Sequence, residues 1–144
     1  MSEPMSAIPA PLRLRLAAAI YDLLPLVGLW FLAVVLALAI TGGALDTHTL
    51  AGKFLVQGLA LVLSSAYFIV SWSRGGQTIG MRAWKLRVVR ADGRSVRWPL
   101  ALLRFIVALV SLAPLGAGFW WALVDAQKRT WHDMAANTMW VRIE

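Results

Sequence analysis

Residues 16–40 read LAAAIYDLLPLVGLWFLAVVLALAI, and the rest of the chain can be understood by its relation to this stretch. A helix of about 20 apolar residues crosses the hydrocarbon core of a bilayer, so the stretch predicts a transmembrane helix. Its single acid is Asp22. A carboxylate at membrane depth is costly unless it is paired or reaches water, which makes Asp22 a candidate functional residue. Arg15 precedes Asp22 by two helical turns, so both side chains lie on one face, about 10 Å apart.

The composition also indicates a membrane protein. The chain has 144 residues, 60% of them hydrophobic, and a soluble domain of this length cannot bury so much apolar surface. The net charge is +7. A basic chain can bind nucleic acid, but Lys and Arg also collect on the cytoplasmic side of membrane proteins, and the apolar runs favour that second interpretation. The absence of cysteine excludes disulfides and thiol chemistry.

The distribution of positive charge predicts the orientation in the membrane. A second transmembrane helix is expected over residues 54–72, where small residues and hydroxyls allow close helix packing. The loop that follows, residues 74–98, holds seven Arg and Lys residues against the single acid Asp92. By the positive-inside rule this loop lies in the cytoplasm together with the N-terminus, and residues 41–53 lie outside.

The basic loop is expected to contain a small sheet. Its β-branched run predicts a strand over residues 84–90, and Asp92-Gly93 is a strong hairpin signal that predicts a second strand over residues 94–98. A two-stranded hairpin alone is marginal in water. Residues 138–143 have the pattern of a third strand, which can join the hairpin only if the C-terminal tail is also cytoplasmic.

The third apolar run, residues 100–124, is interrupted by proline and glycine at residues 114–118. Two topologies remain open. One kinked span would leave the C-terminus outside, whereas a re-entrant helix–turn–helix would return the chain to the cytoplasm. Each half is too short to cross alone. We favour re-entry because Lys128 and Arg129 follow the run and because the third strand then becomes available.

The predicted fold class is therefore an all-α membrane protein. It has two transmembrane helices, a third, broken and re-entrant hydrophobic segment, and a small cytoplasmic β-hairpin extended to a three-stranded sheet. Residues 1–11 are expected to form a disordered leader and residues 12–144 a single membrane domain. The expected location is the cell inner membrane, with several passes and with both termini in the cytoplasm.

The chain resembles the RDD family of small bacterial integral membrane proteins. The matching motifs are RLAAAIYD at 15–22, GGQTIGMR at 75–82, LRVVRADG at 86–93, LLR at 102–104, GAGFWWALVD at 116–125 and RTWHD at 129–133. The family is named for one arginine and two aspartates. The resemblance assigns these to Arg15, to Asp22 and to either Asp133 or Asp125, and it implies transport of an unidentified ligand.

The sequence offers no constellation for catalysis. His48 and His132 lie on opposite sides in the predicted topology, and the serines of the apolar runs have no histidine near them in sequence. Asp46 and His48 supply two potential metal ligands on a loop, which is too few for a site. We therefore expect that the protein is not an enzyme and has no cofactor and no metal.

Two functional classes remain. In the first, buried charges form an ion or small-solute transport site; in the second, the same charges are structural, and the protein is an assembly or accessory partner. The residues of this cluster are Arg15, Asp22, Arg104, Asp125 and Asp133. Because Asp22, Arg15 and Arg104 are predicted at similar depth, we expect Asp22 to accept hydrogen bonds from one or both arginines. The expected partners are the lipid bilayer and either further copies of this chain or other membrane proteins, with no nucleic acid.

Overall fold

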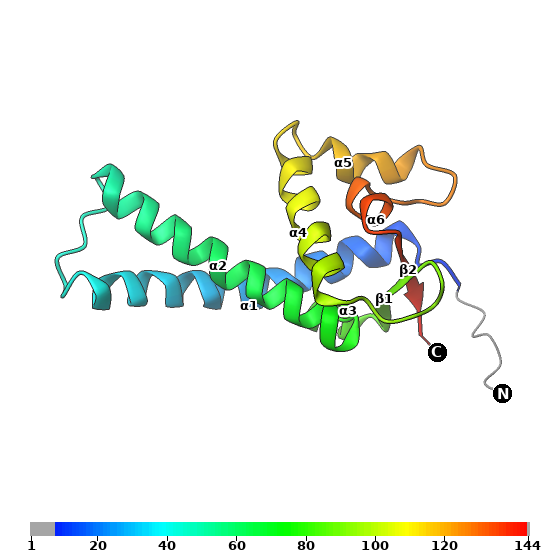
Figure 1. Ribbon diagram of the computed structural model, residues 1–144, viewed down its shortest axis with the longest axis horizontal. Coiled ribbons are helices and arrows are strands. Elements are labelled where there is room, and N and C mark those ends of the chain that lie inside the picture. The colour runs from blue at the N-terminus through cyan, green and yellow to red at the C-terminus, as the bar shows by residue number, and fades with distance from the viewer. Residues whose placement is uncertain (1–7, 144) are drawn as a thin grey trace.

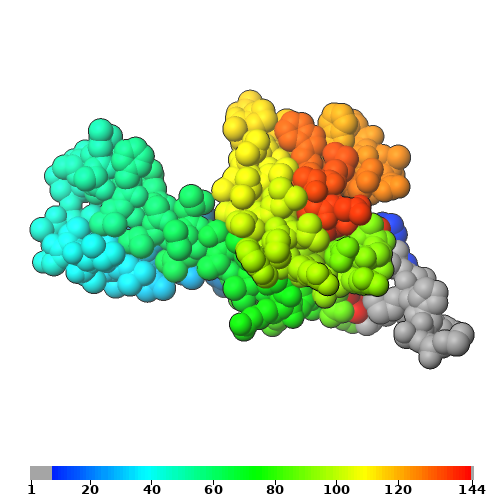
Figure 2. Space-filling view, in the orientation of Figure 1, coloured from blue at the N-terminus to red at the C-terminus, as the bar shows by residue number. Residues whose placement is uncertain are grey.

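The structure is a computed structural model that describes residues 8–143. Two long helices are its largest elements. Helices α1 (Leu12–Ile40) and α2 (Leu50–Gly75) form an antiparallel pair, whose connecting loop projects away from the remaining elements (Figures 1 and 2). Each helix is long and apolar enough to cross a membrane. This confirms the two predicted transmembrane helices, and both extend beyond the apolar residues used to predict them.

Local signals account for the bounds of α2 and for its contact with α1. The Thr49 hydroxyl accepts a hydrogen bond from the Gly52 N–H at the start of α2, and Gly76 ends the helix in the left-handed conformation, with φ +66°. Between the helices, the indole N–H of Trp30 donates to Ser64 Oγ at 3.0 Å. Large apolar side chains such as Leu24 are exposed on the outer faces, as expected for surfaces that contact lipid.

The rest of the chain forms short elements around one end of the α1–α2 pair. These are α3 (Ile79–Ala83), β1 (Leu86–Arg90), α4 (Trp98–Leu112), α5 (Ala117–Trp120), η1 (Trp121–Leu123), α6 (Trp131–Ala135) and β2 (Thr138–Arg142). The axes of α4 and of the α5–η1 segment differ by 106° across the break. Leu115 and Gly116, both at positive φ, lie in this break. The third hydrophobic segment is thus broken, as predicted.

The sheet has two strands, so the prediction of three strands is wrong. Strand β1 pairs antiparallel with β2, and Val88 lies opposite Trp140. The turn at Gly93 does form, because its φ is +79° and its N–H donates to the Arg90 carbonyl at 2.8 Å. The expected hairpin nevertheless fails, because residues 94–97 leave the sheet: Val96 is buried in the core and the chain turns into α4 at Trp98.

The segment before α1 runs along β2. The Ala10 N–H donates to the Trp140 carbonyl at 3.0 Å, the Arg142 N–H donates to the Ile8 carbonyl at 3.1 Å, and Pro9 forms a bridge with Val141. Residues 8–10 of the predicted disordered leader are therefore held against a strand, and residues 1–7 lie outside the described part of the chain. The start of α1, the end of α2 and both strands meet at one end of the molecule (Figure 1).

The hydrophobic core lies at this meeting point. Its buried members are Ala10, Ala18, Trp72, Met81, Leu86, Val88, Val96, Ala101 and Phe105. Small residues allow the closest approach, which is between α3 and α1. A Cβ atom built on Gly80 would lie 2.0 Å from the carbonyl oxygen of Ala18. Helix α3 can therefore pack on α1 only because position 80 has no side chain.

We expect Gly80→Ala to destabilise the protein by about 1–3 kcal/mol or more, because α3 must move away from α1 to admit the methyl group. Chemical or thermal unfolding in detergent measures the change. Gly58→Ala in α2 is the matched control, since a Cβ there has no atom within 4 Å. The control should be neutral or stabilising by up to about 1 kcal/mol through helix propensity. Equal tolerance of both changes would contradict the close α3–α1 contact.

Candidate functional site

A buried cluster of two arginines and one aspartate joins α1, α4 and α6. One guanidinium nitrogen of Arg104 forms an ion pair with Asp133 Oδ1 and also donates to Thr138 Oγ1 at 2.7 Å. Arg15 Nη1 lies 3.6 Å from Asp133 Oδ2. All three charged side chains are at most 7% exposed. The two arginines therefore share one carboxylate, and the cluster carries a net positive charge.

The local structure of α6 positions Asp133. Thr130 caps the helix: its hydroxyl accepts the Asp133 N–H, and the Asp133 carboxylate accepts the Thr130 N–H at 3.1 Å in return. This reciprocal capping box fixes the carboxylate beside the N-terminus of α6. The indole N–H of Trp140, on β2, donates to the same carboxylate at 3.2 Å. Asp133 thus links the helix to the strand as well as to the arginines.

Arg15 ties the beginning of α1 to two other segments. Its Nε donates to the carbonyl of Ala10 at 3.1 Å, and its Nη1 donates to the carbonyl of Lys128. Its guanidinium also lies over the Trp140 ring, 5.5 Å from the centroid. Such a charge receives part of its stabilisation from the aromatic face.

Charge interactions keep Asp133 ionised. Burial alone would raise the pKa of Asp133, but the positive charge of Arg104 and the hydrogen bonds outweigh it and lower that pKa to about 2. The Arg104 guanidinium is further flanked by the rings of Trp72, at 4.9 Å, and Trp140, at 5.8 Å. The Nε and Nη2 atoms of Arg104 have no hydrogen-bond partner among residues 8–143, and the aromatic faces contribute part of the stabilisation of the guanidinium.

His132, next to Asp133, is neutral. Burial is the main cause, with the charge of Arg104 as the second, and together they lower the pKa of His132 to about 3. Its Nε2 lies 3.0 Å from Thr130 Oγ1, and its ring packs on Phe119 with centroids 4.9 Å apart. It is therefore an uncharged polar group beside the charged cluster.

Asp22 does not make the arginine contacts that the sequence led us to expect. Its carboxylate accepts three hydrogen bonds, all from α2 and from the start of α3. The donors are the hydroxyl of Tyr67 at 2.7 Å, the hydroxyl of Thr78 at 2.6 Å and the N–H of Gly80 at 2.8 Å. Asp22 shares the buried face of α1 with Arg15, as predicted, but each side chain has its own partners. The physical reason is that Thr78, Gly80 and Tyr67 together supply enough donors for the Asp22 carboxylate without a counter-charge.

Asp125 also lies apart from the cluster. Its carboxylate pairs with Arg129 at 3.3 Å and accepts the N–H groups of Gln127 and Arg129. The N–H of Arg129 contributes most to lowering the pKa of Asp125. Of the five predicted residues, the structure thus brings together Arg15, Arg104 and Asp133, while Asp22 and Asp125 belong to separate contacts.

Sequence reasoning missed the neutral residues that complete these contacts. They are Tyr67, Thr78, Thr130, Thr138 and Trp140. Only one of them carried a usable signal: Thr130, three residues before an acid, has the spacing of a capping box. Hydroxyls inside or next to apolar runs have the same appearance whether they bond to a carboxylate or to their own helix.

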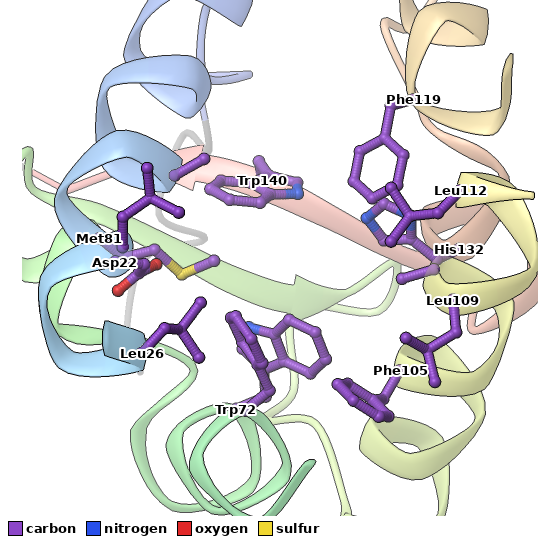
Figure 3. A pocket seen from close by; sticks show the side chains of 14 residues that line it. Asp22, Leu26, Trp72, Met81, Phe105, Leu109, Leu112, Phe119, His132 and Trp140 are labelled. Atoms are coloured by element: carbon purple, nitrogen blue, oxygen red, sulfur yellow. The ribbon is translucent and has the colours of Figure 1, made fainter. Parts of the chain in front are cut away.

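A cavity of about 380 Å³ lies between α1, α2, α4 and α6. Asp22 and His132 line it from opposite sides, with Trp72 and Trp140 between them (Figure 3). Most of its remaining wall is apolar. Across the part of the chain that the structure describes, no group of three or more His, Cys, Asp or Glu residues could hold a metal ion.

The fold and the site together define a small helical membrane protein built around a buried Arg–Asp cluster. The chain belongs to the RDD family, whose family model matches residues 9–137. Comparison with curated proteins and with solved structures gave no match.

We expect Asp133→Asn to destabilise the protein by about 3–5 kcal/mol, because it leaves two buried arginines without their counter-charge, while the asparagine oxygen can still accept the Thr130 N–H. Unfolding in detergent measures the loss. Adding Arg104→Gln should recover part of it, so simple additivity of the two changes would contradict the ion pair. Asp92→Asn is the control, because its side chain is 43% exposed and its pairing with Arg90 is on the surface. That change should cost at most about 1 kcal/mol.

Proposed function

We propose that this protein is a multi-pass protein of the cell inner membrane whose buried charges are structural, and that it acts as a non-transporting, non-catalytic accessory or assembly partner. One observation carries the proposal: each expected transport residue is occupied by bonds within the chain. Asp22 accepts three hydrogen bonds, and Asp133 is shared by Arg15 and Arg104. A transport site needs a charge that can exchange its partner for a solute, and both of these carboxylates already have partners within the chain.

The proposed topology places both termini and the 76–97 segment on the cytoplasmic side. Support comes from the pairing of β1 with β2, because only the short helix α3 separates β1 from α2, and β2 follows the α4–α5 bend. If α1 and α2 both cross the membrane, a third crossing would separate the two strands. The bent segment then enters the bilayer and returns on the same side. The cluster of Arg and Lys in residues 74–98 supports the cytoplasm as that side, because positive residues collect there.

The proposed partners are the lipid bilayer and either further copies of this chain or other membrane proteins. The outer faces of α1 and α2 support this, because large apolar side chains such as Leu24, Phe31 and Phe54 are between 68% and 82% exposed. Those surfaces fit lipid tails or apolar transmembrane helices. They do not fit nucleic acid, whose phosphates require a basic face.

Transport of an ion or a small solute is the second candidate function. The observation in its favour is that Asp22 lines the 380 Å³ cavity between the helices. A carboxylate beside a cavity at membrane depth is a recognised feature of ion and proton pathways. This function requires Asp22 to release at least one of its three present donors.

Cysteine labelling tests the proposed topology, since the chain has no native cysteine. In right-side-out vesicles, an impermeant thiol reagent should label Thr47→Cys, whereas Ser95→Cys and Arg142→Cys should react only after the membrane is opened. Leu115→Cys, at the exposed tip between α4 and α5, distinguishes the two topologies. Re-entry keeps position 115 in lipid and unlabelled. Labelling of positions 115 and 142 from outside would contradict re-entry and indicate a third crossing.

Flux through proteoliposomes tests the structural role of the charges. We expect vesicles containing the wild-type chain to pass Na⁺, K⁺ and H⁺ no faster than protein-free vesicles, as reported by ion-sensitive dyes. Asp22→Asn should leave these rates unchanged while lowering the unfolding temperature, because asparagine accepts hydrogen bonds less strongly than a carboxylate. Flux that is present in the wild type and lost in Asp22→Asn would contradict the proposal and establish the transport alternative.

A further inference from the structure

The cavity between α1, α2, α4 and α6 has the walls of a site for a flat apolar ring. Five aromatic side chains line it: Phe68, Trp72, Phe105, Phe119 and Trp140. Figure 3 shows Trp140 on one side and Trp72 on the other, with open space between them. The volume of about 380 Å³ falls within the range of small-molecule pockets. The contacts described above do not account for this space.

Two side chains that line the cavity have a buried polar atom without a hydrogen-bond partner among the described residues: Trp72, at its indole N–H, and His132. His132 is 4% exposed, it lines the cavity, and its Nδ1 has no hydrogen-bond partner among the described residues. Its other ring nitrogen, Nε2, is turned toward Thr130. The Thr130 oxygen accepts the Asp133 N–H, and we assign its hydroxyl proton to the hydrogen bond with Nε2. The neutral His132 ring then carries its proton on Nδ1, which is a hydrogen-bond donor without an acceptor among the described residues.

Asp22, on the opposite side, differs from His132 in this respect. Its two oxygens already accept three hydrogen bonds from Tyr67, Thr78 and Gly80. The unpartnered groups at the cavity are therefore hydrogen-bond donors, and a ligand that fits them must supply an acceptor and neither a donor nor a cation. A carbonyl oxygen on an otherwise apolar molecule meets this requirement, whereas a charged headgroup would lose its hydration against aromatic walls.

A second cavity extends the first along the membrane-spanning helices. It has a volume of about 370 Å³ and continues between α1, α2 and α4 as far as Trp30 and Gln57. The two cavities share five lining residues: Leu26, Phe68, Phe105, Leu109 and Leu112. The space is thus elongated, with an aromatic end that bears the His132 donor and an apolar end that reaches into the transmembrane pair.

We propose that this pair of cavities binds an isoprenoid quinone taken from the bilayer. The ring lies between Trp72 and Trp140, one quinone carbonyl accepts the Nδ1–H of His132, and the apolar tail follows the second cavity toward Trp30. The proposal concerns binding alone and involves no electron transfer. It is independent of the accessory function proposed above, because it rests on the cavity and not on the charge cluster.

Quenching of tryptophan fluorescence tests the proposal, because Trp72 and Trp140 line the site. The full-length chain in detergent is titrated with decylubiquinone, and the saturable part of the quenching gives the affinity. Ala108→Phe on α4 and Ala19→Phe on α1 each place a ring in the first cavity. Leu24→Phe, on the exposed outer face of α1, is the control. Circular dichroism and size-exclusion chromatography confirm that each variant is folded.

We expect saturable quenching in the wild type and in Leu24→Phe, and affinity weaker by about tenfold or more in Ala108→Phe and Ala19→Phe. His132→Leu, which removes the donor but keeps the volume apolar, should also weaken binding. Three results would overturn the proposal: no saturable quenching in the wild type, wild-type affinity in both filled variants, or displacement of the quinone by a phosphatidylcholine with brominated chains. The last result would assign the cavity to a lipid acyl chain.

Discussion

A single carboxylate, Asp133, is the shared counter-ion of two buried arginines from different parts of the chain, Arg15 and Arg104. Removing such charges from water is costly, and a buried pair is tolerated only when further hydrogen bonds complete it. Thr138 and Trp140 supply those bonds from β2, and Thr130 supplies them from the cap of α6. The positions of α6 and β2 relative to α1 and α4 follow from this requirement, since any displacement would leave a guanidinium unpaired in an apolar surrounding.

The buried face of α1 carries two residues, Arg15 and Asp22, that each hold a different segment of the chain. Arg15 contacts the C-terminal part of the chain at Asp133 and Lys128. Asp22 binds the segment after α2 at Thr78 and Gly80. Ala18 lies between Arg15 and Asp22 and is small enough for α3 to rest on the helix backbone. The aspartate and the arginine of one helix face therefore hold two separate segments, and neither neutralises the other.

Periodicity and length were sufficient to predict the two long helices, the break near Pro114 and a strand over residues 138–143, observed as Thr138–Arg142, because each depends on local pattern. The partners of Asp22 were not predictable in this way. The similar predicted depth of Asp22 and Arg104 on two helices suggested a contact between them. Instead, the Gly80 N–H and the hydroxyls of Tyr67 and Thr78 bind the Asp22 carboxylate. The sequence does not reveal which loop will cover a given helix face. The lost hairpin has a similar cause: the turn at Gly93 formed as its sequence indicates, but burial of Val96 and the start of α4 took priority over a third strand.

The residues that pair in the charge cluster lie far apart in sequence, so their contacts form in a fixed order as the chain is synthesised. Arg15 and Arg104 are made well before Asp133, and β1 is made well before its partner β2. Until residues 133–142 leave the ribosome, the nascent chain therefore holds two arginines without their acid and a strand without its neighbour. The α1–α2 pair precedes these residues in the chain, but the contacts of α4, α6 and β1 are completed only with the final segment. A chain truncated before Asp133 would keep both arginines without this acid and β1 without its partner strand.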